Sequence, residues 1–265
     1  MNRLAPVAPV LIGAAAGALY VRERRERLAT ERFGAATLET LLNAIDANNP
    51  DTGAHVRRVA EYSLMLADAA GLDERRKRSI ERVALFHDIG KLDGAISDII
   101  DVSKRLTPRE RIAVRKHPQR GADVLRPLAA FYPELPIAVL SHHERWDGSG
   151  YPRGLRGRRI PIEARVVAIA DTFDAVTHAR SYSPARSIEV GIEVIAAGSG
   201  TQFDPDFAEL FLSPPVIDCV KDSMLERNAP RRKGGTRRGK SAANETPDIT
   251  FRWRTPTALR QRAGL

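Results

Sequence analysis

The 265-residue chain is long enough for one large domain or two small ones, and its 43% hydrophobic and 28% charged residues are typical of a globular protein. Its one cysteine, Cys219, excludes an internal disulfide and fits a reducing compartment. The net charge of +9 is unevenly placed, because residues 226–265 carry 11 Lys and Arg against 3 Asp and Glu, whereas residues 1–225 carry 31 against 30. The main part of the chain is therefore close to neutral, and nucleic acid is not an expected partner.

Residues 4–21, LAPVAPVLIGAAAGALYV, contain no charge. The stretch is near the lower length limit for a membrane span, and its Ala, Gly and Pro residues make it only weakly apolar. We predict a single-pass anchor, with a cleaved signal peptide or a loosely packed soluble helix as the alternatives. Because RERRER follows, the positive-inside rule puts the rest of the chain on the cytoplasmic side of the cell membrane. Residues 22–34 are then a charged connector, and residues 1–34 form one N-terminal segment.

Apolar residues recur every three or four positions through most of the following chain, and no alternating segments suggest a sheet. RVVAIA, which follows Ile162, could be a strand, but its apolar residues keep the helical step. The fold class is therefore all-α, a bundle of about seven helices that forms one domain over residues 35–215. Helices are predicted over 35–47, from Asp51 onward, over about 75–90, from a capping box at Thr107 to His117, over 162–178, and over about 185–197 and 205–212.

The pattern weakens after Pro215. APRRKGGTRRGKSAANETP is basic, contains glycine and has no large apolar residue. Such a composition buries too little apolar surface to offset the entropy of folding. We therefore predict a largely disordered basic tail over residues 216–265.

Five of the six histidines stand in four recognisable settings, DTGAH, LFHDIGK, RKHP and HHERWDGSGYP. Neutral imidazole is the commonest metal ligand among side chains. In the last setting, Gly148 and Gly150 allow a sharp turn or a close approach of the backbone, and Pro152 favours an extended Tyr151. The loop is therefore expected to have a fixed shape.

FHDIGK, RKHP, HHERWDGSGYP and IADTFDAV follow one another in this order between residues 35 and 212. In this combination the chain resembles the HD-GYP branch of the HD superfamily of metal-dependent phosphohydrolases. The resemblance implies the helical bundle of that superfamily and a centre for two metal ions, with Asp88 as the bridging ligand. The implied ligands are His55, His87, Asp88 and Asp171 for the metal core, and His117, His142 and His143 for the second metal.

A phosphodiester resists hydrolysis because its negative charge repels a nucleophile, and two divalent ions a few ångströms apart relieve that repulsion. Mixed imidazole and carboxylate ligands suit iron, manganese or zinc, and we expect iron or manganese. Asp51, four residues before His55, resembles a glutamate that some family members use for a third metal. A helix N-cap explains Asp51 equally well.

Other residues match family positions around the substrate. Lys91 completes the HDxxK spacing and resembles the phosphate-contacting lysine, so Asp88 and Lys91 are the expected catalytic residues. Asp174 and Arg180 match positions that line the substrate side, where arginine can grip a phosphate through two parallel donors. Ser183 stands where the family usually has a basic residue, so one phosphate contact is missing.

Gly150, Tyr151 and Pro152 form the GYP signature, which resembles a structural or partner-facing loop more than a set of ligands. Asp147 is a candidate for holding this loop in place. The resemblance as a whole implies a phosphodiesterase that hydrolyses cyclic di-GMP to linear pGpG or GMP in bacterial second-messenger signalling. The alternatives are a non-catalytic cyclic-dinucleotide receptor or interaction module that uses the GYP surface, and an HD hydrolase of another nucleotide.

Overall fold

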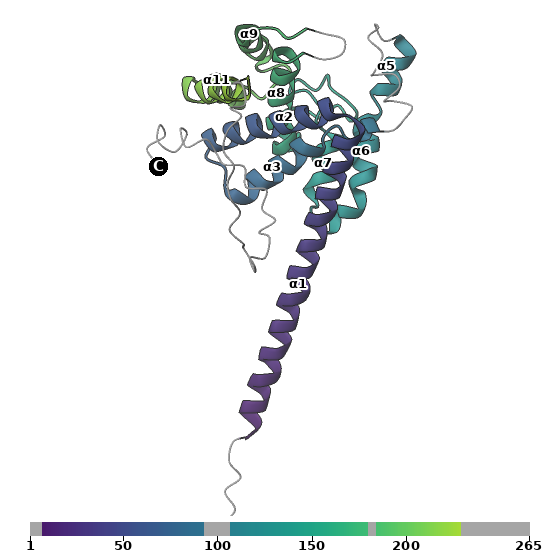
Figure 1. Ribbon diagram of the computed structural model, residues 1–265, viewed down its shortest axis with the longest axis vertical. Coiled ribbons are helices and arrows are strands. Elements are labelled where there is room, and N and C mark those ends of the chain that lie inside the picture. The colour runs from purple at the N-terminus through teal and green to yellow at the C-terminus, as the bar shows by residue number, and fades with distance from the viewer. Residues whose placement is uncertain (1–6, 93–106, 180–183, 229–265) are drawn as a thin grey trace, which may run out of the picture. The chain divides into compact units, whose positions relative to one another are not determined.

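A computed structural model describes residues 7–92, 107–179 and 184–228 (Figure 1). The regular elements in these ranges are helices, with one isolated bridge between Ser199 and Phe203, so the all-α prediction is confirmed. By its contacts the chain divides into two units, residues 1–41 and 42–265. The helices are α1 (Val7–Asn48), α2 (Pro50–Ala69), α3 (Glu74–Phe86), α5 (Pro108–Val114), α6 (His117–Leu125), α7 (Glu134–Leu140), α8 (Ile162–Thr177), α9 (Ile188–Gly198), α10 (Pro205–Leu212) and α11 (Pro214–Asn228), with short 3-10 helices η1 (Ile89–Leu92), η2 (Arg126–Ala130) and η3 (Gly157–Arg159).

Helix α1 is one continuous element, although the sequence suggested an anchor, a connector and a separate helix. None of the helices that the structure describes combines the length and the apolar character that a bilayer crossing requires. The predicted anchor over residues 4–21 begins outside the described residues, and the described ones give it no support, so the cytoplasmic face of a membrane stays a prediction.

The core of the second unit forms where α2, α3 and α8 pack against one another. Helix α2 contributes buried apolar residues to this core, among them Val59 and Ala60 at 0% exposure. Tyr62 on the same helix is also fully buried, and its ring packs edge-on against Phe173 of α8 at 5.7 Å. This packing fixes the relative positions of α2 and α8, each of which carries predicted ligands.

The helix predicted from Thr107 to His117 is wrong at its C-terminal end. The capping box is present, since the Thr107 hydroxyl accepts from the Glu110 N–H and the Glu110 carboxylate accepts from the Thr107 N–H. However, α5 ends at Val114 and α6 begins at His117. Pro118 explains the break, because proline suits the first turn of a new helix and not the interior of an old one.

Helix α11 corrects the predicted tail, which does not begin at residue 216. Val216 and Val220 are 0% exposed, and the helix packs against α2 and α10. The Ser223 hydroxyl donates to Glu61 at 2.5 Å, and Arg227 forms an ion pair with the same carboxylate. The described part of the tail, residues 216–228, therefore belongs to the folded unit, and α6, α7 and α11 raise the helix count above the predicted seven or so.

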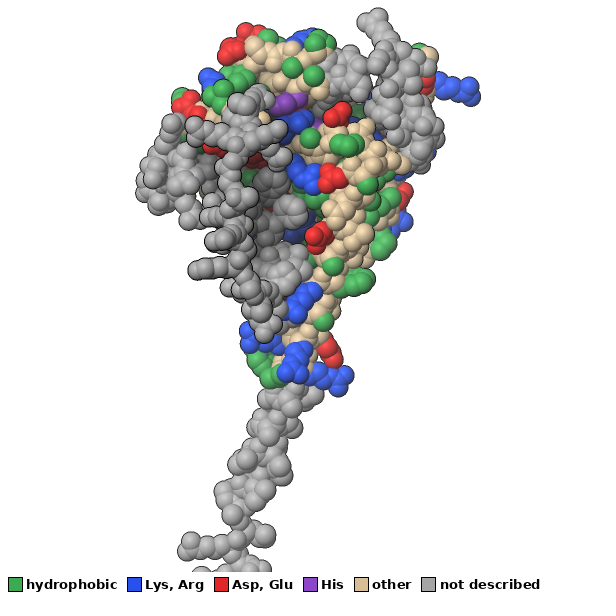
Figure 2. Space-filling view, viewed as in Figure 1, with side chains coloured by type: hydrophobic (Ala, Val, Ile, Leu, Met, Phe, Trp, Pro, Cys, Tyr) green, Lys and Arg blue, Asp and Glu red, His purple; other side chains and the backbone are tan. Residues whose placement is uncertain are grey.

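The surface of the described chain mixes charges of both signs. Figure 2 shows Lys and Arg side chains interspersed with Asp and Glu side chains over the face in view. This pattern agrees with the nearly balanced count of charges in residues 1–225, 31 basic against 30 acidic. The excess of positive charge therefore belongs mainly to residues 226–265, most of which follow the described part of the chain.

We predict that the folded unit needs α11 but not the residues after it. A chain that ends at Leu212 should lose several kcal/mol of unfolding free energy, because each buried Val or Ile side chain contributes about 1.5–3 kcal/mol. A chain that ends at Asn228 should keep the melting behaviour of the full chain. Chemical denaturation of the three chains checks this, and equal stability of the chain ending at Leu212 would contradict it.

Candidate metal centre

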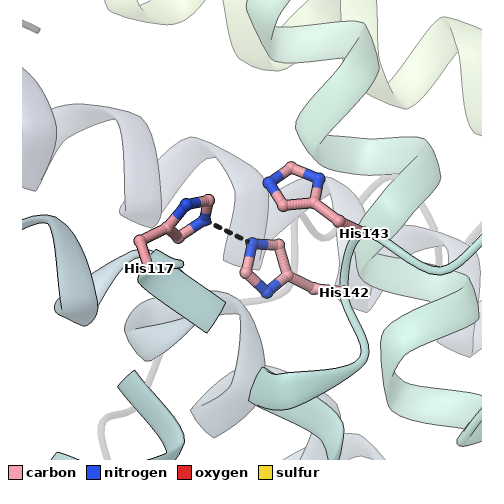
Figure 3. A group of neighbouring side chains, drawn as sticks. All are labelled: His117, His142 and His143. Carbon is pink, nitrogen blue, oxygen red and sulfur yellow. Dashed lines mark hydrogen bonds between the residues drawn. The ribbon is translucent and has the colours of Figure 1, made fainter. Parts of the chain in front are cut away.

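Six of the predicted ligands form two groups of three in the second unit. In each group the possible ligand atoms all lie within 4.8 Å of one another. Figure 3 shows the second group, in which Nε2 of His117 and Nε2 of His142 are 3.0 Å apart. The first group is His55, His87 and Asp171, and the second is His117, His142 and His143.

Asp88, the seventh predicted ligand, lies between the two groups. Its Oδ2 is 3.4 Å from Nε2 of His87 and 3.8 Å from Nε2 of His55. Its Oδ1 is 3.3 Å from Nε2 of His117 and 3.9 Å from Nε2 of His142. Each oxygen of one carboxylate thus faces a different group, which is the arrangement that a ligand bridging two ions requires.

A glycine allows the first motif to approach the second. His87 and Asp88 lie in the turn between α3 and η1, and Gly90 follows two residues later. A Cβ on Gly90 would lie 2.1 Å from the backbone oxygen of His117 and 2.6 Å from the backbone nitrogen of Gly121. Only glycine therefore permits η1 and α6 to come this close, which brings Asp88 within reach of His117.

Three of the histidines are held by the same local device. Each stands within three residues after the end of a helix, and its Nδ1 lies 2.6–2.7 Å from the backbone oxygen three residues earlier. The carbonyls of a last helical turn lack partners within the helix, and a carbonyl can only accept. Nδ1 therefore carries the proton, and Nε2 presents its lone pair to the site. The pairs are His87 with Ala84, His117 with Val114, and His142 with Val139.

His55 is held instead by a carboxylate, because it lies within α2. Its Nδ1 is 2.6 Å from Oδ2 of Asp174, which is fully buried. Arg58 donates to both oxygens of Asp174 at 2.6 and 3.0 Å, and Nδ1 of His178 lies 3.0 Å away. Although burial raises the pKa of Asp174, hydrogen bonds from His178, His55 and Arg58 lower it more. Asp174, which was predicted to line the substrate side, is enclosed in this structure and contacts His55 directly.

Burial and charge set the protonation of the other ligands. Burial would raise the pKa of Asp88, but the charge of Lys91 and the neighbouring imidazoles hold it well below its usual range. Burial lowers the pKa of His142 well below the ordinary value and that of His143 to about 4. The carboxylate is thus ionised and these imidazoles are neutral, as metal ligands must be.

The unpaired atoms of the site test whether metal ions fit. Seven buried side-chain atoms among the described residues have no hydrogen-bond partner, and three of them, His55 Nε2, His87 Nε2 and Asp88 Oδ1, lie in this centre. Buried polar atoms without a partner are rare because desolvation is costly. All three atoms belong to the predicted ligand set and face the space between the two groups. The residues present therefore fit two divalent ions.

The signature loop packs directly on the second group. The Tyr151 ring stacks on the His143 ring, with centroids 5.0 Å apart and planes at 25°. A Cβ on Gly150 would lie 2.3 Å from the backbone nitrogen of Arg145, so this position also requires glycine. The peptide bond before Pro152 is cis. The loop is therefore part of the framework of the site, whether or not a partner contacts it.

Two carboxylates shape this loop. The predicted role of Asp147 is confirmed, since its carboxylate accepts from the backbone N–H of Ser149 at 2.9 Å and from the Ser149 hydroxyl at 2.6 Å. Buried Glu144 accepts from the N–H groups of Arg153 and Leu155 at 2.8 and 2.9 Å. Sequence reasoning missed Glu144, although an acidic residue directly after two ligands was a usable signal. It also missed Arg58, which lies one helical turn after His55.

Some predicted residues lie away from the centre or outside the described ranges. Asp51 is exposed in the first turn of α2 and belongs to neither group. Its alternative role as N-cap is wrong, because the Asn49 side chain accepts from the N–H groups of Asp51 and Thr52. Arg180 and Ser183 lie outside the described residues.

Comparison with known proteins relates this centre to a family. The model of the HD domain matches residues 39–207. The chain is 37% identical over 178 residues to the cyclic di-GMP phosphodiesterase response regulator RpfG of Xanthomonas campestris pv. campestris, covering 66% of this chain and 47% of that protein. It is 40% identical over 177 residues to 3'3'-cGAMP-specific phosphodiesterase 2 of Vibrio cholerae, covering 65% and 33%. The chain thus spans half or less of the length of these relatives.

A solved structure shares the fold. The crystal structure of the cyclic GMP-AMP-specific phosphodiesterase V-cGAP3 of V. cholerae matches with a TM-score of 0.53 and 22% identity, over 73% of this chain and 52% of that one. At this identity the likeness concerns the fold alone. The helical arrangement that carries the two groups is therefore one found in solved structures.

We predict that two ions bind per chain and that Asp88 serves both. Asp88→Ala should lower the metal content at both groups, whereas His117→Ala should lower it by about one ion, because only the second group loses a ligand. Elemental analysis of purified protein after loading with Mn²⁺ or Fe²⁺ measures this, with Asp123→Ala on α6 as a matched surface control. Full activity with a single bound ion would contradict the bridging arrangement.

We predict that Asp174 acts through His55 and not on a substrate. Asp174→Asn should weaken metal binding by about 10–100-fold, the range for loss of a group that orients a ligand. Titration with Mn²⁺ measures the dissociation constant, and at saturating metal the Michaelis constant should return towards that of the unaltered chain. A raised Michaelis constant with unchanged metal affinity would restore the substrate-side role.

Proposed function

Because the chain belongs to the HD domain family, in its HD-GYP branch, we propose that it is a metal-dependent phosphodiesterase that hydrolyses a cyclic dinucleotide. The observation that carries the proposal is the position of Asp88, one carboxylate whose two oxygens face separate groups of ligands. Bound divalent ions would draw charge from a phosphodiester and lower the pKa of a water molecule. The residues that would hold them are His55, His87 and Asp171 on one side, His117, His142 and His143 on the other, and Asp88 between.

The chain's own residues fix the orientation of the ligands and place a positive charge beside them that can attract a phosphate. The backbone carbonyls and Asp174 fix the proton of each anchored imidazole on Nδ1, so the rings need no reorganisation on binding. Nζ of Lys91 lies 2.6 Å from Oδ2 of Asp88, and its side chain is 25% exposed. The ammonium group is thus at the edge of the centre, and we assign it the contact to the phosphate that is cleaved.

We propose cyclic di-GMP as the substrate and pGpG or GMP as the product. The name of the X. campestris relative supports this choice. A second candidate, 3'3'-cGAMP, has support of the same kind, because the V. cholerae relative named for it is 40% identical. A receptor or interaction module without catalysis would not need a complete ligand set, and all seven predicted ligands are present.

The experiment is turnover by the purified full chain loaded with Mn²⁺ or Fe²⁺. We expect hydrolysis of cyclic di-GMP to linear product, measured by chromatography, and its loss in Asp88→Ala. Faster turnover of 3'3'-cGAMP would make that dinucleotide the substrate. Tight binding of either compound by metal-loaded protein without any turnover would favour the receptor instead.

A further inference from the structure

We propose that Arg115, a residue outside the signature motifs, binds the phosphate of the cyclic dinucleotide that is not being cleaved. The inference rests on the proposed function, because it concerns the same site. Its basis is a line of contacts from the second group to the surface. His143 stacks on Tyr151 with centroids 5.0 Å apart, and Cζ of Arg115 lies 4.3 Å from the centroid of the Tyr151 ring.

Exposure increases along this line. His142 beside His143 is buried, His143 and Tyr151 are half-buried, and Arg115 is exposed. Both contacts involve the Tyr151 ring, so only this one ring links the guanidinium carbon of Arg115 to the His143 ring. An exposed cation therefore lies on the Tyr151 ring, which itself stacks on a member of the group that would hold the second ion.

The geometry of the contact leaves the guanidinium free to bind an anion. Its carbon lies over an aromatic ring, an attraction that does not use the N–H groups. Those groups point outward in the guanidinium plane and match two phosphate oxygens. In the described part of the chain, no carboxylate lies within ion-pair distance of Arg115.

Among the described residues, three other cations near the centre have partners. Lys91 pairs with Asp88, Arg58 with Asp174, and Arg153 donates to the Ser141 hydroxyl at 2.6 Å. A cyclic dinucleotide has two phosphates on opposite sides of one ring, so a centre that grips one leaves the other to a separate cation. Arg115 has the position and the unused donors that this second contact needs.

The test measures binding and turnover with the metal-loaded full chain. Arg115→Ala should raise the dissociation and Michaelis constants for cyclic di-GMP by about 10–100-fold, as expected for a lost charge-assisted hydrogen bond. Arg115→Lys should give a smaller rise, because lysine keeps the charge without the planar fork. Arg111→Ala is the matched control, since Arg111 is also exposed and lies one helical turn earlier.

Three comparisons make the result decisive. The rise should be similar for 3'3'-cGAMP, because the two compounds share their phosphates, and smaller for bis(p-nitrophenyl) phosphate, which has only one. An effect on a single dinucleotide would overturn the proposal in favour of base reading, and unchanged constants or a loss of bound metal in Arg115→Ala would overturn it outright. If the unaltered chain hydrolyses no dinucleotide, the proposed function fails, and binding measured by calorimetry still decides the role of Arg115.

Discussion

The whole centre depends on the burial of one ionised carboxylate. Asp88 is 5% exposed, and a buried charge is costly unless opposite charge and hydrogen-bond donors surround it. The ammonium group of Lys91 supplies the opposite charge at 2.6 Å from Oδ2. Nε2 atoms of four imidazoles lie within 4 Å of the two oxygens, and these would hold the ions together with Asp88. Because the two oxygens face different groups of imidazoles, this one carboxylate also sets the separation of the two sites. The elements that carry these neighbours must therefore converge on a single turn.

Helix ends make this convergence possible. A histidine just after a helix finds an unpaired carbonyl at a fixed distance, which orients the ring without any tertiary contact. Three ligands use this device, so their orientation is decided by sequence-local geometry and only their mutual distance depends on the fold. His55 lies within a helix whose carbonyls are already paired, and it needs Asp174 from α8. The α2–α8 packing is consequently part of the metal centre.

The difference between orientation that is set by local sequence and distance that is set by the fold explains what the sequence could predict. Ligands are recognisable because each must be a particular residue type within a local motif, and the structure places all seven as two groups and a bridge. Asp174 could not be assigned from sequence, since its burial follows from tertiary packing. Helix α11 was missed for a similar reason. Its apolar stripe is short and follows two prolines, and its polar partner, Glu61, lies far away in the chain.

The cations near the site also differ in what holds them. Those that lie closest to the centre stabilise carboxylates, Lys91 on Asp88 and Arg58 on Asp174, so changing them would disturb the metal ligands themselves. A cation held by an aromatic ring does not stabilise a carboxylate of the centre, so changing it would leave the metal ligands in place. The Arg115 guanidinium lies over the Tyr151 ring, which stacks on His143, and it pairs with no carboxylate among the described residues. The chain can therefore alter how it grips the distant part of a substrate while the buried ligands, which are constrained by desolvation and geometry, stay unchanged.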